Sequence, residues 1–105
     1  MSVVSLYCVF GNAEEAERIG RTVVEERLAA CINILAPCRS IYRWDSRIEQ
    51  ADEVPALLKT TAAAADRLIA RIADLHSYAV PAITVWPLDR LHAPYGEWVE
   101  ATVVP

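Results

Sequence analysis

Residues 28 to 61 decide the fold, and they read LAACINILAPCRSIYRWDSRIEQADEVPALLKTT. We interpret this stretch as one long β-hairpin, because both arms are rich in β-branched and aromatic residues and the short polar turn Asp45-Ser46 separates them. Side chains alternate near the turn, where Tyr42 and Trp44 fall on the same side of the strand. Asp-Ser is a weaker turn signal than Asn-Gly, so the sequence leaves the turn type open.

The first arm of this hairpin is long for the chain that carries it. A strand from Cys31 to Trp44 would span about 46 Å at roughly 3.3 Å per residue, whereas a compact chain of this size has a diameter of roughly 33 Å. Pro37 permits a bend, because proline cannot donate a hydrogen bond to a neighbouring strand. For the same reason, Pro55 in the return arm predicts a bulge or an unpaired stretch.

The tip of the hairpin, beyond Pro37, is apolar. It carries Ile41, Tyr42, Trp44 and Ile48. An exposed arm of this composition needs a partner to cover it. We therefore expect the protein to associate with itself, and the alternative is a hairpin that folds back over its own sheet.

Hydrophobic periodicity predicts the other elements. They are a strand over Val3–Phe10, a helix from Ala13 to about Ala29, a helix from Ala62 to about His76, a strand over Ala82–Trp86 and a short helical segment near Gly96–Val99. The order strand, helix, strand, strand, helix, strand is that of the ferredoxin-like split β-α-β sandwich, an α+β fold. Right-handed crossovers place both helices on one face of the sheet and leave the other bare. Oligomerisation would cover the bare face and the hairpin tip together.

Two capping signals set the expected helix starts. Asn12, with Glu15 three residues later, is an N-cap signature that predicts a first helix beginning at Ala13. Thr61 can cap the second helix.

Length and composition narrow the class of protein. The 105 residues leave room for one domain, residues 1–105, and 54% of them are apolar, a share high enough to suggest burial between subunits. The net charge of −4 gives no electrostatic footprint for nucleic acid or an anionic membrane. The start of the chain has no basic region and no apolar run approaches a membrane span, so we expect a cytoplasmic protein.

Most of the cysteines and histidines can be interpreted either as structural residues or as metal ligands. Three widely spaced cysteines favour reduced thiols over a disulfide framework. Cys8 alternates in phase with its apolar neighbours and reads as core, with a thiolate ligand as the alternative, and the same choice applies to Cys31 and Cys38. His76 ends a helix, where its cation would suit the helix dipole, or it ligates a metal. His92, in a proline-flanked loop, reads as surface.

The charged and aromatic residues point to pockets rather than to a reaction. Lys59 lies late in an apolar strand, where a charge needs a partner or a cavity unless the position is an edge that reaches solvent. The acidic residues Glu49, Asp52 and Glu53 lie close together in the return arm, but strand alternation divides them between two faces, which argues against a paired-carboxylate catalytic site. Amphipathic aromatics of the kind that line interfaces recur at Tyr42, Trp44, Tyr78, Tyr95 and Trp98. With no phosphate loop or catalytic motif, we expect a protein that is not an enzyme.

The chain resembles the CutA divalent-cation tolerance family, from about Val3 to Trp98. The blocks that carry the resemblance are Leu28-Ala29-Ala30-Cys31-Ile32-Asn33, Ser40-Ile41-Tyr42-Arg43-Trp44, Glu49, Glu53-Val54, Leu58-Lys59-Thr60-Thr61 and His76-Ser77-Tyr78-Ala79-Val80-Pro81. The resemblance implies a ferredoxin-like fold assembled as a tight homotrimer with interleaving hairpins, in a plan similar to the PII signalling proteins. It also implies binding of copper and other divalent ions through residues that match Cys8 and His76. Leu75 stands where a family member can carry a second histidine.

Three functions compete on this sequence. The first is a trimer that binds copper or other divalent cations, whose site must draw on several subunits or on water because one chain supplies few clustered ligands. The second is a PII-like signalling or scaffold trimer that binds a small anion or metabolite in a pocket between subunits, and an enzyme using that pocket is the third. The residues expected at this inter-subunit pocket are Tyr42, Trp44, Glu49, Glu53, Lys59, Tyr78 and Trp98.

Overall fold

The computed structural model describes residues 2–105 as a mixed α+β fold with five strands and three helices. In chain order the elements are β1 (Val3–Phe10), α1 (Ala13–Glu25), β2 (Cys31–Ile34), β3 (Cys38–Trp44), β4 (Arg47–Thr61), α2 (Ala65–Leu75), β5 (Ile83–Pro87) and α3 (Ala93–Thr102). The predicted order of strands and helices is confirmed, and α3 is longer than the short helical segment that the sequence indicated.

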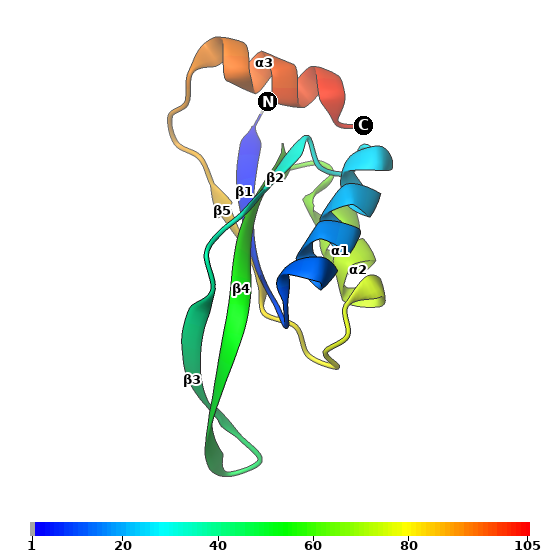
Figure 1. The fold of residues 1–105 in the computed structure, drawn as a ribbon. Coiled ribbons are helices and arrows are strands. Elements are labelled where there is room, and N and C mark those ends of the chain that lie inside the picture. The colour runs from blue at the N-terminus through cyan, green and yellow to red at the C-terminus, as the bar shows by residue number, and fades with distance from the viewer. Residues whose placement is uncertain (1) are drawn as a thin grey trace.

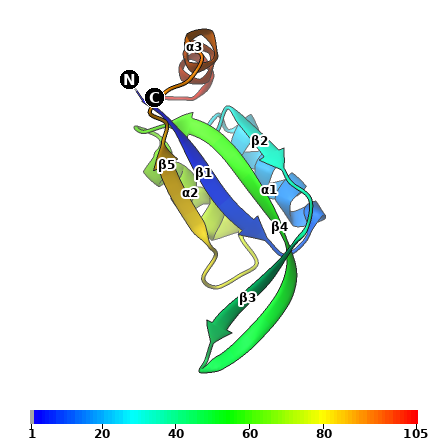
Figure 2. The same ribbon diagram turned by 90° about the vertical axis from the view of Figure 1, so that its left-hand side faces the viewer.

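The sheet has the ferredoxin-like arrangement. Its strand order is β2-β4-β1-β5, every pairing is antiparallel, and β3 pairs with the outer part of β4. Helices α1 and α2 lie side by side on one face, as the right-handed crossovers predicted (Figures 1 and 2). Helix α3 lies across the end of the sheet, where its Val99 is buried together with Val3 (Figure 1).

The core lies between the sheet and helices α1 and α2. Strand β1 is central, and Leu6, Cys8 and Phe10 point from it into this core without any exposed surface. Helix α1 contributes Ile19 and helix α2 contributes Ile72, both fully buried. The strand predicted over Val3–Phe10 is confirmed, and it lies between β4 and β5 with the apolar side chains of its helix-facing side removed from water.

The opposite face of the sheet, which we call the open face, has no helix over its middle (Figure 1). In the cross-strand register it carries Ser5, Tyr7 and Val9 of β1 and their partners Lys59, Leu57 and Pro55 of β4. The ring of Trp86 in β5 stacks on the ring of Tyr7 at 5.8 Å between centroids and stays half exposed. Within residues 2–105 the predicted helix-free face therefore exists, although Ser5, Val9 and Pro55 on it are buried.

The β3–β4 hairpin projects beyond the rest of the sheet (Figure 2). The molecule measures 44 × 26 × 23 Å, longer than a compact chain of this size, so the hairpin overhangs rather than folding back over its own sheet. Its turn is formed by Asp45 and Ser46, whose φ angles of 48° and 64° identify a type I′ turn. The hairpin and its turn position are confirmed as predicted.

The break between β2 and β3 contains Pro37 and lies opposite Pro55 of β4. Ile34 pairs with Ala56, but the next paired residue, Cys38, is opposite Glu53, so three residues of this arm face two of β4. Pro55 itself stays in register with Val9 on its other side, and its carbonyl accepts a hydrogen bond from Leu35 N at 3.0 Å. The irregularity predicted at Pro55 is thus real, but the extra residue lies in the partner strand.

Helices α1 and α2 are both shorter than the sequence periodicity predicted. Helix α1 ends at Glu25 rather than near Ala29, because Arg27 adopts a left-handed conformation with φ of 60°. Leu28 N then donates to Val23 O and Arg27 N donates to Val24 O, the paired bonds of a Schellman motif that stops a helix. Helix α2 begins at Ala65 rather than Ala62, since Thr61 Oγ1 caps the turn before it by accepting from Ala64 N.

Candidate functional site

A pocket of about 460 Å³ lies on the open-face side, between the β3–β4 hairpin and the segment that follows α2. The aromatic side chains of Tyr42, Trp44 and Tyr78 line it, and Glu53 supplies a carboxylate. Four residues of the predicted inter-subunit pocket therefore come together within a single chain. Ser40 and Val80 also line the pocket and were missed, because neither residue type signals a site from sequence.

Strand alternation explains how the hairpin contributes to this pocket. Ser40, Tyr42 and Trp44 occupy alternate positions of β3, so their side chains share one face of the hairpin. Cys38 pairs with Glu53 and Tyr42 pairs with Glu49, which places both acidic residues on that same face.

Tyr78 reaches the pocket from another part of the chain. Its hydroxyl donates a hydrogen bond of 2.7 Å to Glu53 Oε2, which joins the segment after α2 to strand β4. Burial, together with the Glu53 carboxylate, raises the pKa of Tyr78 to about 12. The hydroxyl therefore remains a proton donor at neutral pH.

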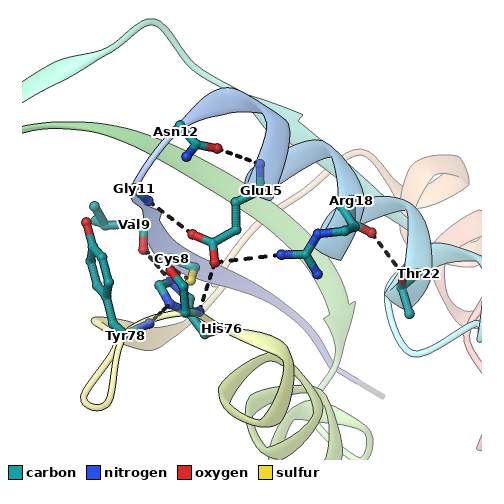
Figure 3. Close-up of polar contacts among 10 residues, drawn as sticks. Cys8, Val9, Gly11, Asn12, Glu15, Arg18, Thr22, His76 and Tyr78 are labelled. Atoms are coloured by element: carbon teal, nitrogen blue, oxygen red, sulfur yellow. Dashed lines mark hydrogen bonds and ion pairs between the residues drawn. The ribbon is translucent and has the colours of Figure 1, made fainter.

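His76 fixes the backbone next to Tyr78 (Figure 3). Its Nε2 lies 2.8 Å from Val9 O, and its Nδ1 accepts a hydrogen bond of 3.0 Å from Tyr78 N. A carbonyl can only accept and a backbone N–H can only donate, so the ring hydrogen is on Nε2. The ring also stacks on Phe10 with centroids 5.2 Å apart. Both ring nitrogens of the buried His76 are thus engaged in structural hydrogen bonds.

Glu15 connects the start of α1 to the same segment (Figure 3). Asn12 Oδ1 accepts from Glu15 N at 2.8 Å, as the N-cap signature predicted. The carboxylate accepts from Gly11 N at 3.3 Å and from Ser77 N at 2.8 Å. Burial alone would raise the pKa of Glu15, but the hydrogen bonds from Ser77 and Gly11 outweigh it and lower the pKa. The link to Ser77 was missed, since 62 residues separate the partners and no local pattern signals it.

Cys8 lies in the core, close to His76 (Figure 3). Its thiol is fully buried and lies 3.8 Å from Val9 O. Burial, and then the charge of Glu15, raise the pKa of Cys8 to about 12. A metal ligand must be a thiolate, which this surrounding strongly disfavours.

The donor set does not fit a resident metal ion in the closed single chain. Cys8 holds its proton, and His76 uses both nitrogens for backbone hydrogen bonds. Among residues 2–105, no three His, Cys, Asp or Glu side chains gather closely enough to hold an ion. Cys31 and Cys38 are partly buried free thiols, with Cys31 Sγ 3.5 Å from Tyr95 Oη, and His92 is exposed before α3.

Three expected pocket residues lie outside the pocket of the single chain. Glu49 is beside it, as the register partner of Tyr42. Lys59 is on the open face but pairs with Ser5 and Cys31, away from the hairpin. Trp98 is on α3, where its ring packs against Tyr95 at 5.7 Å between centroids. Their participation in a pocket between subunits stays a prediction.

The family comparison covers almost the whole chain. Residues 4–102 match the family model described as CutA1 divalent ion tolerance protein. The chain is 41% identical over 88 residues to the divalent-cation tolerance protein CutA of Thermus thermophilus, a match that covers 84% of this chain and 85% of that protein. It is 35% identical over 98 residues to the protein CutA of Mus musculus, covering 93% of this chain and 55% of the mouse protein. The chain thus spans about half the length of this mammalian relative.

Solved structures agree with the sequence comparison. The CutA structure from Xylella fastidiosa has a TM-score of 0.95 and 31% identity, and the match covers 99% of this chain and 100% of that one. The CutA structure from Archaeoglobus fulgidus, described as a periplasmic divalent cation tolerance protein, has a TM-score of 0.94 at 32% identity over 97% of this chain and 99% of that one. None of the helices in residues 2–105 combines the length and apolar character needed to cross a membrane. On the match to residues 4–102 and the shared fold, this chain belongs to the CutA1 divalent ion tolerance family.

Proposed function

We propose that this chain acts as a homotrimer that contributes to tolerance of divalent cations, copper among them. The projecting hairpin is the observation that supports assembly, because Ile41, Trp44 and Ile48 are 67%, 51% and 63% exposed. Large apolar side chains on a thin two-stranded arm are unfavourable in water unless another surface covers them. The proposed number of three subunits follows from the family resemblance. The open face offers a surface on which the hairpin of another copy can pack.

Assembly also offers Lys59 a counter-ion. None of the ion pairs within residues 2–105 includes Lys59, although the residue is half buried. Glu53 is buried and likewise has no basic side chain within ion-pair distance in the described part of the chain. We propose that Lys59 of one copy meets Glu49 or Glu53 of the next, because a buried charge is costly without a partner.

Copper binding is proposed at Cys8 and His76 as an ion taken up by the assembly. Cys8 must lose its proton and His76 must release a backbone hydrogen bond, so uptake requires local opening of the segment after α2. The remaining ligands come from neighbouring copies or from water. A soft thiolate and an imidazole suit copper better than they suit magnesium or calcium.

Calorimetric titration of the purified protein with Cu(II) and Zn(II) tests this proposal. Single Cys8→Ala and His76→Ala variants, checked to remain oligomeric, should each bind copper more weakly than the wild type at neutral pH. His92→Ala serves as the matched control, since it removes an exposed imidazole away from Cys8. Affinity should fall with falling pH, because protons compete for both ligands. If both variants keep wild-type affinity, the site is elsewhere or the binding is adventitious.

A second function is favoured by the 460 Å³ pocket. Its volume is in the range of small-ligand sites, and it combines aromatic walls with one placed carboxylate. This arrangement supports a PII-like signalling or scaffold trimer that binds a small ligand beside the hairpin. Both proposals are for a cytoplasmic binding protein rather than an enzyme, in keeping with relatives that are named as tolerance proteins.

A further inference from the structure

The pocket beside the hairpin carries negative charge. Glu53 lines it and is only 8% exposed, and its Oε2 accepts the hydrogen bond from the Tyr78 hydroxyl. Within residues 2–105, Glu53 has no basic side chain within ion-pair distance. A carboxylate this deeply buried favours the approach of a cation, because a hydroxyl alone does not neutralise its charge.

The aromatic walls favour the same sign of charge. The rings of Tyr42, Trp44 and Tyr78 surround the space next to Glu53, from β3 and from the segment after α2. The face of an aromatic ring carries negative electrostatic potential and attracts cations, most strongly where water is excluded. Tyr78 is held by its contact with His76, at 4.8 Å between ring centroids, and by Glu53, so its ring does not have to be ordered on binding.

The lysine expected in this pocket is elsewhere. Lys59 lies six positions after Glu53 on β4, which corresponds to about 20 Å at roughly 3.3 Å per residue. Arg39 and Arg43 of β3 fall on the other face of the hairpin, and Arg47, which pairs with Trp44 at the exposed tip, does not line the pocket. The basis for expecting an anionic ligand is therefore missing from the pocket of the single chain.

We propose that this pocket binds a small organic cation, such as a quaternary ammonium or a protonated amine, with Glu53 as its counter-ion and the rings of Tyr42, Trp44 and Tyr78 around the cationic group. The proposal rests on the second function above and names the ligand class for that pocket, with Glu49 rather than Glu53 as the partner of Lys59 from another copy. Compact hydrated metal ions fit this environment less well, because the walls offer rings and methyl groups rather than several oxygen ligands.

Calorimetric titration with choline and with its neutral carbon isostere, which has the same shape without the charge, tests the proposal on the wild-type protein. Choline should bind at least about tenfold more tightly than the isostere, given the energy of a buried ion pair. Glu53→Gln should reduce choline affinity about tenfold, while its amide oxygen still accepts from Tyr78. Trp44→Leu should reduce it about fivefold.

Asp52→Asn is the matched control, since it removes the same charge from the adjacent, exposed position on the opposite face of β4 and should leave choline affinity within about twofold. The oligomeric mass of every variant is measured in the same buffer, so that a loss of assembly is separated from a loss of binding. Equal affinity for choline and its isostere, or wild-type affinity in Glu53→Gln, would overturn the cation assignment.

The remaining outcomes separate this inference from the function on which it rests. Binding of the isostere or of acetate in preference to choline overturns the cation class and leaves a small-ligand pocket. Absence of binding by all three probes counts against both. If Lys59→Met binds choline and the wild type does not, Lys59 of another copy occupies the pocket, and the inference of a free ligand is overturned.

Discussion

Replacing Glu15 by glutamine should separate the segment after α2 from the start of α1. The carboxylate accepts from Ser77 N at 2.8 Å and from Gly11 N at 3.3 Å, and a glutamine has only one oxygen to serve these two donors. The other donor then faces an amide NH₂ group and stays without a partner. Because Glu15 is only 6% exposed, we expect Glu15→Gln to lower the free energy of unfolding by about 2 kcal/mol, the usual effect of losing a buried hydrogen bond to a charged group.

The same contact predicts a pH dependence with a defined sign. The hydrogen bonds outweigh burial, so the pKa of Glu15 in the folded chain is below its ordinary value of 4.5. A carboxyl whose pKa falls on folding stabilises the fold above its unfolded pKa, and this stabilisation is lost as pH falls through the folded pKa. The difference between wild type and Glu15→Gln should therefore be complete at neutral pH and shrink as pH falls below 4.5.

Urea denaturation followed by circular dichroism, at one fixed protomer concentration, measures this difference. Glu14→Gln is the matched control, because Glu14 lies in the same first turn of α1 but is exposed, so both variants lose a similar interaction with the helix dipole. We expect the control to lose only about 0.5 kcal/mol. Equal losses in the two variants, or a difference that persists unchanged at acid pH, would refute the role assigned to Glu15.

Two further predictions concern packing in the core. A Cβ added at Gly20 would lie 2.7 Å from Ile32 Cδ1, so Gly20→Ala should destabilise the fold by about 1 kcal/mol despite the better helix propensity of alanine. Ile32→Val removes that atom, so it should lower the free energy of unfolding less in the Gly20→Ala background than in the wild type. Urea denaturation of the two single variants and the double variant measures this, and additive losses of free energy would contradict the contact. Cys8 should resist iodoacetamide in the folded protein at neutral pH, given its burial and its pKa of about 12, and react once urea unfolds the chain. Mass spectrometry of digested samples measures the modification, and rapid labelling of Cys8 in the folded protein would count against the burial described.

Local patterns predicted the hairpin because the determining residues are close in sequence. Asp45 and Ser46 lie between two apolar arms, and Pro37 marks the point where pairing lapses. The end of α1 was not predictable in the same way. The left-handed residue that ends a helix is usually a glycine, which can be recognised in a sequence, but here Arg27 adopts that conformation. The Arg27 side chain donates hydrogen bonds to the carbonyls of Thr102 and Ala101 in α3, which are 75 and 74 residues away in sequence.

The pocket was only partly predictable for a geometric reason. Alternation correctly places Tyr42 and Trp44 on one face, and Tyr78 was included for its residue type and its place in the family motif. Alternation also places Lys59 on the face of Glu53, but it carries no information on separation along the strand, which removes Lys59 from the pocket of one chain. The contact between Glu15 and Ser77 depends on the tertiary fold and leaves no trace in either local segment.

Assembly through the hairpin is the central claim, and native mass spectrometry at micromolar protomer concentration tests it most directly. We predict a main species of three times the 11.6 kDa chain mass. Trp44→Asp should shift the protein towards lower mass, because it places a charge in the apolar hairpin, whereas Arg21→Asp on the exposed side of α1 should leave the trimer intact. A wild-type protein that is mainly monomeric under these conditions would contradict the account.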